Sequence, residues 1–360
     1  MNDISVPLST QSEDEQEPNL ATINFYEIRK YIYFLSSALL ILFIEKFAIE
    51  WKWAHIFFSY EYGFMKRGLL GQVFRVLSIP TDLDNFKVFS VFMLLGVVVT
   101  YYNLIKKFSH KTFFEFAPFF ISSPLLLKNL IYDWGRFDQI AIAVIFLQII
   151  WVGEKRKSHY LLLLTPLLIF IHEGTVLWAF PIIFTIAYFE NRKTLYLVAP
   201  LVLYSVLAIL IWGGLDIDAD TYLKRLNAWA APNSVHWAII YTLTASIKDS
   251  IAYSLVGLEI NVNSDRGHLA IVLLASSIIS LSFLKSMLLV AFNILALISA
   301  SALFVVANDH FRWVALMGMI NLFFLLYAHK KNQIKDTKIL RFYLVAMSIV
   351  GLLLPPIGIY

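Results

Sequence analysis

Long apolar runs recur along almost the whole of this 360-residue chain, and they constrain its fold more than any other feature. Hydrophobic residues make up 59% of the sequence and charged residues only 15%, whereas a soluble domain is about half apolar and about a quarter charged. In lipid, each span must satisfy its own backbone hydrogen bonds, which a helix does. The sequence therefore predicts an all-α, polytopic transmembrane helical bundle.

The apolar runs divide the chain into about eleven predicted spans. Residues 1–24 are polar and acidic and predict a disordered cytoplasmic tail, whereas residues 25–360 form a single transmembrane domain. With the N-terminus inside, nearly every short cytoplasmic turn is basic, as the positive-inside preference expects. The predicted spans are residues 31–50, 87–105, 112–127, 139–153, 160–171, 174–189, 195–213, 268–284, 286–306, 313–328 and 339–358.

Residues 160–189 admit two interpretations. One long helix is possible, but it would invert every later span, whereas two short helices that meet near Gly174 keep the basic turns inside. Two external segments are also long. Residues 51–86 are aromatic and predict amphipathic helices at the outer leaflet, and residues 214–267 predict one large external loop.

The external connections carry most of the polar side chains that are candidates for chemistry. Lys66 and Arg67 precede a glycine, and an arginine fork suits phosphate oxygens; an ordinary basic pair that touches lipid headgroups is the alternative. Asp133, Arg136 and Asp138 follow in a second connection. Arg136 is a candidate for binding an anionic substrate, but Asp133 and Arg136 can equally pair across one helical turn, and Asp138 can be a helix cap.

His172 and Glu173 form the sharpest candidate pair, since a carboxylate can orient an imidazole that acts as a general base. The alternative is a hydrogen-bonded histidine that bridges two broken helices. Asp309, His310 and Arg312 in the last external connection are further substrate-binding candidates, or else a helix cap with a solvated basic neighbour. An Asp-x-Asp-x-Asp run at 216–220 lacks the rest of a calcium loop, so no metal site is predicted.

Other classes of chemistry lack their motifs. The chain has no cysteine, no P-loop and no dinucleotide-binding glycine pattern. If the chain is an enzyme, its substrate must therefore already be at the outer leaflet, which points to an anionic, lipid-carried donor. Arginines would hold the phosphate, and a histidine or carboxylate would activate the acceptor hydroxyl.

The chain resembles the polytopic glycosyltransferases of the GT-C superfamily and the O-antigen polymerases of the Wzy type. The resemblance lies in residues 133–138 (DWGRFD), an apolar helix, a basic turn, residues 170–174 (FIHEG) and an apolar segment with Pro181. The acidic pair expected in the first external loop is represented only by Glu61 or by Asp82 and Asp84.

The resemblance implies an enzyme of the bacterial inner membrane, with a cytoplasmic N-terminus and a periplasmic active side. It would join glycan units carried on undecaprenyl pyrophosphate, as in lipopolysaccharide biosynthesis, with no cofactor and no required metal. Arg67, Arg136 and Arg312 would bind pyrophosphate, and His172 would be the base beside Glu173 or Asp138. Membrane lipids, a chain-length regulator and a flippase would be its partners, and nucleic acid would not.

Three alternatives stay open. A GT-C transferase would add a single sugar from a polyprenyl phosphate. A lipid-linked glycan transporter would usually carry polar groups on both sides of the membrane. A membrane acyltransferase would be expected to present its polar groups to the cytoplasm, where its acyl donor is made. The concentration of polar groups on the predicted external side favours a glycan polymerase.

Overall fold

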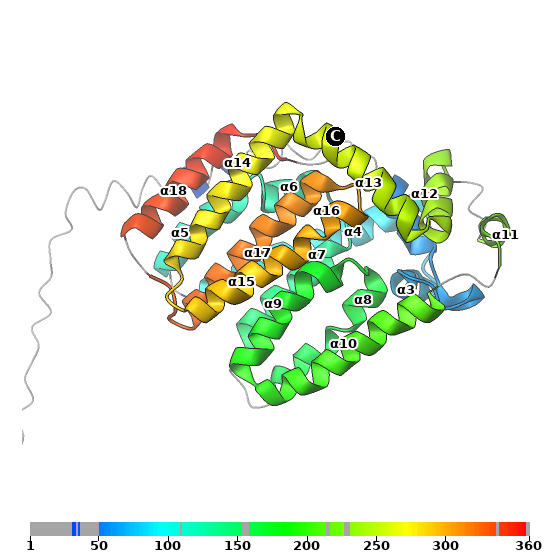
Figure 1. Cartoon of the computed structure of the whole chain (residues 1–360), viewed down its shortest axis with the longest axis horizontal. Coiled ribbons are helices and arrows are strands. Elements are labelled where there is room, and N and C mark those ends of the chain that lie inside the picture. Colours follow the sequence, from blue (N-terminus) through cyan, green and yellow to red (C-terminus); the bar gives the residue numbers. More distant parts are fainter. Residues whose placement is uncertain are drawn as a thin grey trace, which may run out of the picture.

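Figure 1 shows the computed structural model of the chain as an assembly of helices. The structure describes residues 31–33, 35–36, 50–108, 110–152, 158–213, 217–226, 231–335 and 338–357. Within these ranges the regular structure is helical, apart from one isolated β-bridge between Leu284 and Ile334, so the all-α prediction is confirmed. The named elements are α2 (Glu50–Trp53), η2 (Ala54–Phe57), η3 (Tyr60–Tyr62), α3 (Gly68–Val76), α4 (Leu83–Phe108), α5 (His110–Ser122), α6 (Leu127–Tyr132), α7 (Asp138–Trp151), η4 (Ser158–Leu164), α8 (Leu167–Ile171), α9 (Thr175–Glu190), α10 (Arg192–Trp212), α11 (Ala219–Arg225), α12 (Asn233–Thr244), α13 (Ile247–Val262), α14 (Asp265–Ile279), η6 (Ser280–Phe283), α15 (Met287–Ser301), α16 (Leu303–Val306), α17 (His310–Lys330) and α18 (Lys338–Leu353).

Five helical segments in the described ranges are long and apolar enough to cross a membrane. This finding fits a membrane protein, but it does not reach the predicted number of about eleven spans. Several apolar helices are shorter, such as α7 and α9, and the predicted tail and most of the first predicted span lie outside the described residues. The five segments are Leu83–Phe108, Arg192–Trp212, Asp265–Phe283, Met287–Val306 and His310–Lys330.

Helix α17 lies at the centre of the bundle. It packs against α7, α9, α14 and α15, and its most apolar stretch is entirely buried; Figure 1 shows it alongside α15. Helix α10 lies at the edge, where only 22% of the corresponding stretch is buried and Leu210, Ile211 and Trp212 are exposed. A helix that is apolar all round is stable in either place, because lipid and protein interior are similar solvents for it.

The break within residues 160–189 is present in the structure. Helix α8 ends at Ile171, His172 takes an extended backbone conformation, and α9 begins at Thr175 after Gly174. The structure therefore has two helices in this region, as the second interpretation predicts. The break places His172 and Glu173 at the tip of a helical hairpin, where their side chains reach residues from other parts of the chain.

The predicted large external loop is mostly helical in its described part. Helices α11, α12 and α13 and the start of α14 occupy residues 219–225, 233–244, 247–262 and 265–267. Their starts are set by ordinary caps: Asp218 caps α11, Ser264 caps α14, and Ser246 forms a capping box with Asp249. Asp218 thus has a structural role, whereas Asp216 lies outside the described residues.

The aromatic segment 51–86 was expected to lie along the outer leaflet, but much of it is packed inside the protein. Trp53, Phe57 and Phe58 are buried, and α3 packs against η2. Its exposed apolar side chains include Val73 and Val76 on α3 and Leu77 and Ile79 just after it. The segment therefore closes one end of the bundle and fixes the start of α3, directly after the basic pair at 66–67.

Gly71 is the position at which this packing is tightest. A Cβ atom at Gly71 would lie 1.9 Å from the Phe58 carbonyl oxygen and 2.5 Å from that of Ile56, and neither backbone atom can easily move. We expect Gly71→Ala to push α3 away from η2 and to lower the Tm in detergent, since overpacking commonly costs about 1–3 kcal/mol.

Gly96 on α4 provides the matched control for that substitution. A Cβ atom there would meet no other atom within 4 Å. Gly96→Ala is expected to leave the Tm unchanged or to raise it, because alanine is the better helix former by about 1 kcal/mol. Equal Tm values for the two variants would show that the contact between α3 and η2 is not as tight as described.

Candidate functional site

A pocket of about 340 Å³ opens where several separate parts of the chain meet. Its charged side chains come from the residues just before α3, the turn between α6 and α7, the tip between α8 and α9, and the start of α17 with the residue before it. The predicted site residues that line the pocket are Lys66, Arg67, Arg136, His172, Glu173, Asp309 and Arg312. The structure therefore brings together most of the residues that the sequence singles out, although they span almost 250 positions.

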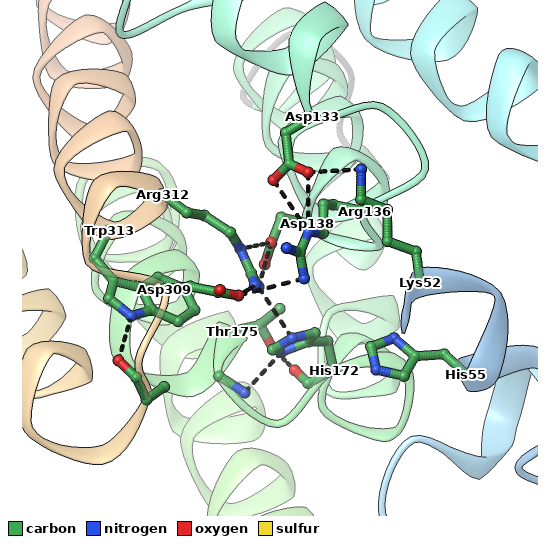
Figure 2. A network of polar contacts seen from close by, with 12 residues as sticks. Lys52, His55, Asp133, Arg136, Asp138, His172, Thr175, Asp309, Arg312 and Trp313 are labelled. Atoms are coloured by element: carbon green, nitrogen blue, oxygen red, sulfur yellow. Dashed lines mark hydrogen bonds and ion pairs between the residues drawn. The ribbon is translucent and has the colours of Figure 1, made fainter. Parts of the chain in front are cut away.

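Arg312 is the centre of the buried charge network in Figure 2. Its guanidinium lies 2.6 Å from the Asp138 carboxylate and 2.7 Å from that of Asp309, and it contacts His172 Nε2 at 3.1 Å. Asp138 is the first residue of α7, and its carboxylate binds Arg312 rather than the backbone of its own helix. The network thus ties the starts of α7 and α17 to the tip before α9.

Arg136 and Asp133 form the local pair that their spacing suggests, with Nε and Oδ2 3.0 Å apart. The pair is also part of a longer chain of charges. Asp133 Oδ1 lies 2.6 Å from Lys52 Nζ, and Arg136 Nη1 lies 3.3 Å from Asp309. The local pair is therefore present, and Arg136 also lines the pocket.

Arg67 and Glu173 form a bidentate ion pair at the pocket wall. Arg67 Nη2 and Nε donate to the two carboxylate oxygens at 2.6 and 2.8 Å. Arg67 has a left-handed backbone (φ 63°), which is rare for a residue other than glycine and directs its side chain toward Glu173 and His55. The guanidinium lowers the pKa of Glu173 well below its usual range, against the effect of burial.

Lys66 differs from the three arginines because its charge is free to bind another group. Within the described residues its ammonium has no hydrogen-bond or ion-pair partner, although it lines the pocket. Burial lowers the pKa of Lys66, which means that the cation is poorly solvated and gains from a nearby anion.

His172 does not have the arrangement of an oriented general base. Its side-chain partner is Arg312, and its Nδ1 accepts a hydrogen bond from the Gly174 backbone N–H. A neutral imidazole has one acceptor nitrogen and meets two donors here, whereas a protonated ring would have no acceptor at all. Burial, together with the charge of Arg67, lowers the pKa of His172 to about 4. The imidazole is therefore neutral at pH 7 and serves as a hydrogen-bonding group.

Three predicted site residues, Asp133, Asp138 and His310, do not line the pocket, and of these only His310 also lies outside the charge network of Arg136 and Arg312. Its ring contacts Ser254 and Asn261 of α13 and the carbonyl of Phe304. These contacts hold α13 against the start of α17, so the structure gives His310 a packing role. Its neighbours Asp309 and Arg312 face the pocket instead.

Lys52 and His55 belong to the same network, but no motif in the sequence indicates them. Both are buried; Lys52 pairs with Asp133, and His55 Nε2 lies 2.9 Å from Arg67 Nη1. The only signal in the sequence is that each interrupts an aromatic segment that is otherwise apolar. A polar residue in such a segment requires a partner, but the sequence does not say which one.

The wall of the pocket carries more positive than negative charge. Its wall carries four cations (Lys66, Arg67, Arg136 and Arg312) and two carboxylates, an excess of two positive charges when the histidines are neutral. Among the described residues no group of three or more His, Cys, Asp or Glu side chains has the geometry to hold a metal ion. The carboxylates of Asp138, Glu173 and Asp309 all face guanidinium groups instead.

Comparison with protein-family models, with curated proteins and with solved structures finds no match for this chain. The feature of the chain that bears on function is therefore the pocket, which is positively charged, partly buried and surrounded by apolar helices.

Proposed function

We propose that the pocket is the active site of a membrane glycosyltransferase that joins glycan units carried on polyprenyl pyrophosphate into a surface polysaccharide. The observation that carries the proposal is the free ammonium of Lys66 beside the Arg67–Glu173 pair. Such a pair can exchange: a phosphate group is a stronger partner for a guanidinium fork than one carboxylate. A lipid-carried substrate also explains why the site belongs to a bundle of apolar helices.

Exchange at Arg67 gives Glu173 a second function. When paired with Glu173, the guanidinium of Arg67 holds the carboxylate in its ionised form and makes it a weak base. When the pyrophosphate of the donor binds Arg67 and Lys66, Glu173 loses its strongest partner and becomes a better proton acceptor. Its side chain is 32% exposed, so an acceptor hydroxyl has access to it. Binding of the donor thus prepares the base.

The proposed reaction is a displacement at the anomeric carbon of the donor sugar. Glu173 takes the proton of the acceptor hydroxyl, whose oxygen forms the new bond to the anomeric carbon. The bond between that carbon and the phosphate oxygen breaks, and its electron pair leaves with the polyprenyl pyrophosphate. Lys66 and Arg67 stabilise the negative charge of the leaving group, while Arg136, Arg312 and His172 keep the pocket in shape.

Lys66→Ala tests the proposed function. We expect the purified variant in detergent to bind inorganic pyrophosphate about tenfold more weakly than the wild type, because one charged hydrogen bond is lost. A deletion strain that expresses the variant is expected to make less long-chain polysaccharide on a gel. Lys87→Ala, which removes an exposed ammonium on α4, is the control and should change neither measurement.

The pH dependence of this binding follows from the lowered pKa of Lys66. The ammonium loses its proton at a lower pH than an ordinary lysine, so affinity for pyrophosphate should fall as the pH rises through the alkaline range. The Lys66→Arg variant keeps its charge over this pH range and should flatten the pH profile of pyrophosphate binding.

The polysaccharide gel of the Lys66→Ala strain separates the two transferase proposals. An unchanged ladder of chain lengths on this gel rejects polymerisation. An intact ladder whose repeat unit lacks one sugar indicates a single-sugar transferase.

A further inference from the structure

One wall of the pocket is built from aromatic side chains rather than from charges. Trp51 on α2, Trp237 and Tyr241 on α12, and Tyr253 on α13 all line it, and we call them the aromatic wall. Their rings contact one another: the centroids of Trp51 and Trp237 lie 5.0 Å apart, and those of Trp237 and Tyr241 lie 5.2 Å apart in a stacked arrangement. Tyr241 and Tyr253 extend the cluster at 6.2 Å.

The wall is open to a ligand. Trp237 and Tyr253 are each 53% exposed, although large aromatic side chains gain most from burial. Their polar atoms are open as well. Within the described part of the chain, the indole N–H groups of Trp51 and Trp237 and the hydroxyls of Tyr241 and Tyr253 have no hydrogen-bond partner.

Aromatic residues nearby that serve the fold behave differently. The indole of Trp53 donates to the Thr81 carbonyl, that of Trp313 donates to the Ala307 carbonyl, and the Tyr222 hydroxyl donates to the Phe57 carbonyl. Each of these residues is buried and uses its polar atom to fix backbone. The aromatic wall combines exposed ring faces with free donors, and this combination fits a ligand with both apolar C–H faces and hydroxyl groups.

We infer that the aromatic wall is a binding site for the sugar rings of a glycan, separate from the phosphate-binding side of the pocket. A pyranose ring presents C–H groups on its faces and hydroxyls around its edge, so it can stack on Trp237 while its hydroxyls meet the free donors. This inference rests on the proposed function for the order of binding: with phosphate at Lys66 and Arg67, the attached sugars would extend along the wall.

A membrane-interface belt is the competing explanation for exposed tryptophan and tyrosine residues. Helix α10 offers such a residue for comparison, because Trp212 is 65% exposed and does not line the pocket. The two explanations make opposite predictions about sugar binding. If the aromatic wall is a sugar site, replacing Trp237 weakens binding of a dissolved glycan and replacing Trp212 does not. If both residues belong to an interface belt, neither replacement affects glycan binding.

The experiment titrates the full-length protein in phospholipid nanodiscs with one oligosaccharide repeat unit of the source organism, released from its lipid carrier by mild acid and free of phosphate. Binding is followed by calorimetry and by tryptophan fluorescence. We expect the wild type and Trp212→Ala to bind equally and Trp237→Ala to bind about tenfold more weakly. Trp237→Phe retains a ring and should recover part of the lost affinity, which separates stacking from a general loss of structure.

Absence of binding to the wild type, or equal affinity of Trp237→Ala and the wild type, overturns the inference. Its failure is distinguishable from failure of the proposed function. If Lys66→Ala stops polymer formation but no phosphate-free glycan binds, the enzyme proposal stands and the wall has another role. If the glycan binds and Lys66→Ala leaves the polymer unchanged, the wall is a sugar site in a protein of another function.

Discussion

Replacing Glu173 with glutamine is expected to lower glycan transfer by about 10²- to 10⁴-fold, the range that a general base contributes. Glutamine has the same size and can still accept a hydrogen bond from Arg67, but it cannot take the acceptor's proton. The affinity of the Glu173→Gln variant for inorganic pyrophosphate should be unchanged or higher than that of the wild type, because the Glu173 carboxylate competes with phosphate for Arg67. The measurements are polymer formation from purified lipid-linked donor and pyrophosphate binding by calorimetry.

The combination of these two measurements identifies the role of Glu173. A carboxylate that only stabilised the fold would, when neutralised, weaken pyrophosphate binding and lower the Tm together with transfer. Glu259→Gln, at an exposed position on α13, is the matched control and should leave all three values unchanged. Full transfer activity in Glu173→Gln would exclude this residue as the base and return attention to Asp309, the other carboxylate in the pocket wall.

The second large effect is expected from Arg312→Ala. Arg312 donates to Asp138 Oδ2 through Nε, and its Nη2 lies 2.6 Å from the same oxygen. The other carboxylate oxygen, Asp138 Oδ1, is buried and has no hydrogen-bond partner among the described residues. Removing the guanidinium leaves a buried carboxylate with no ion-pair partner, which commonly costs about 3–5 kcal/mol. The variant should therefore show a much lower Tm in detergent and a poor yield of folded protein.

A second substitution separates the charge effect from lost packing. Arg312→Ala combined with Asp138→Asn removes the unpaired carboxylate and should recover a large part of the Tm, although not the activity. Arg266→Ala, at an exposed position at the start of α14, is the control. If the double variant is no more stable than Arg312→Ala, the ion pair with Asp138 is not what makes Arg312 important.

Much of this architecture could be predicted from the sequence because few physical rules determine it. Apolar runs indicated helices, and charges between the runs indicated a shared pocket, since ionisable groups at such positions need one another. Arg67, Arg136, His172 and Arg312 do line one pocket. The break before α9 was also predicted, because two short helices that meet near Gly174 keep the basic turns on one side of the membrane.

Other features required the three-dimensional structure. The sequence suggests that His172 and Glu173 act together because they are adjacent, but an extended backbone at His172 sends the two side chains to different arginines. Lys52 and His55 could not be assigned partners, because the residues they contact are distant in sequence. Helices α11 to α13 were interpreted as a loop because they lack a long apolar run, although Asp218 and Ser246 are caps that mark helix starts in the sequence.

The central position of α17 has a consequence for how the protein responds to its surroundings. The helices around it separate α17 from lipid, so Arg312 at its start is held by protein groups alone. Changes in acyl-chain length or headgroup charge act first on the peripheral helices such as α10. The electrostatics of the pocket should accordingly stay constant between membranes of different composition, and ligand binding in the pocket should not depend on the surrounding lipid.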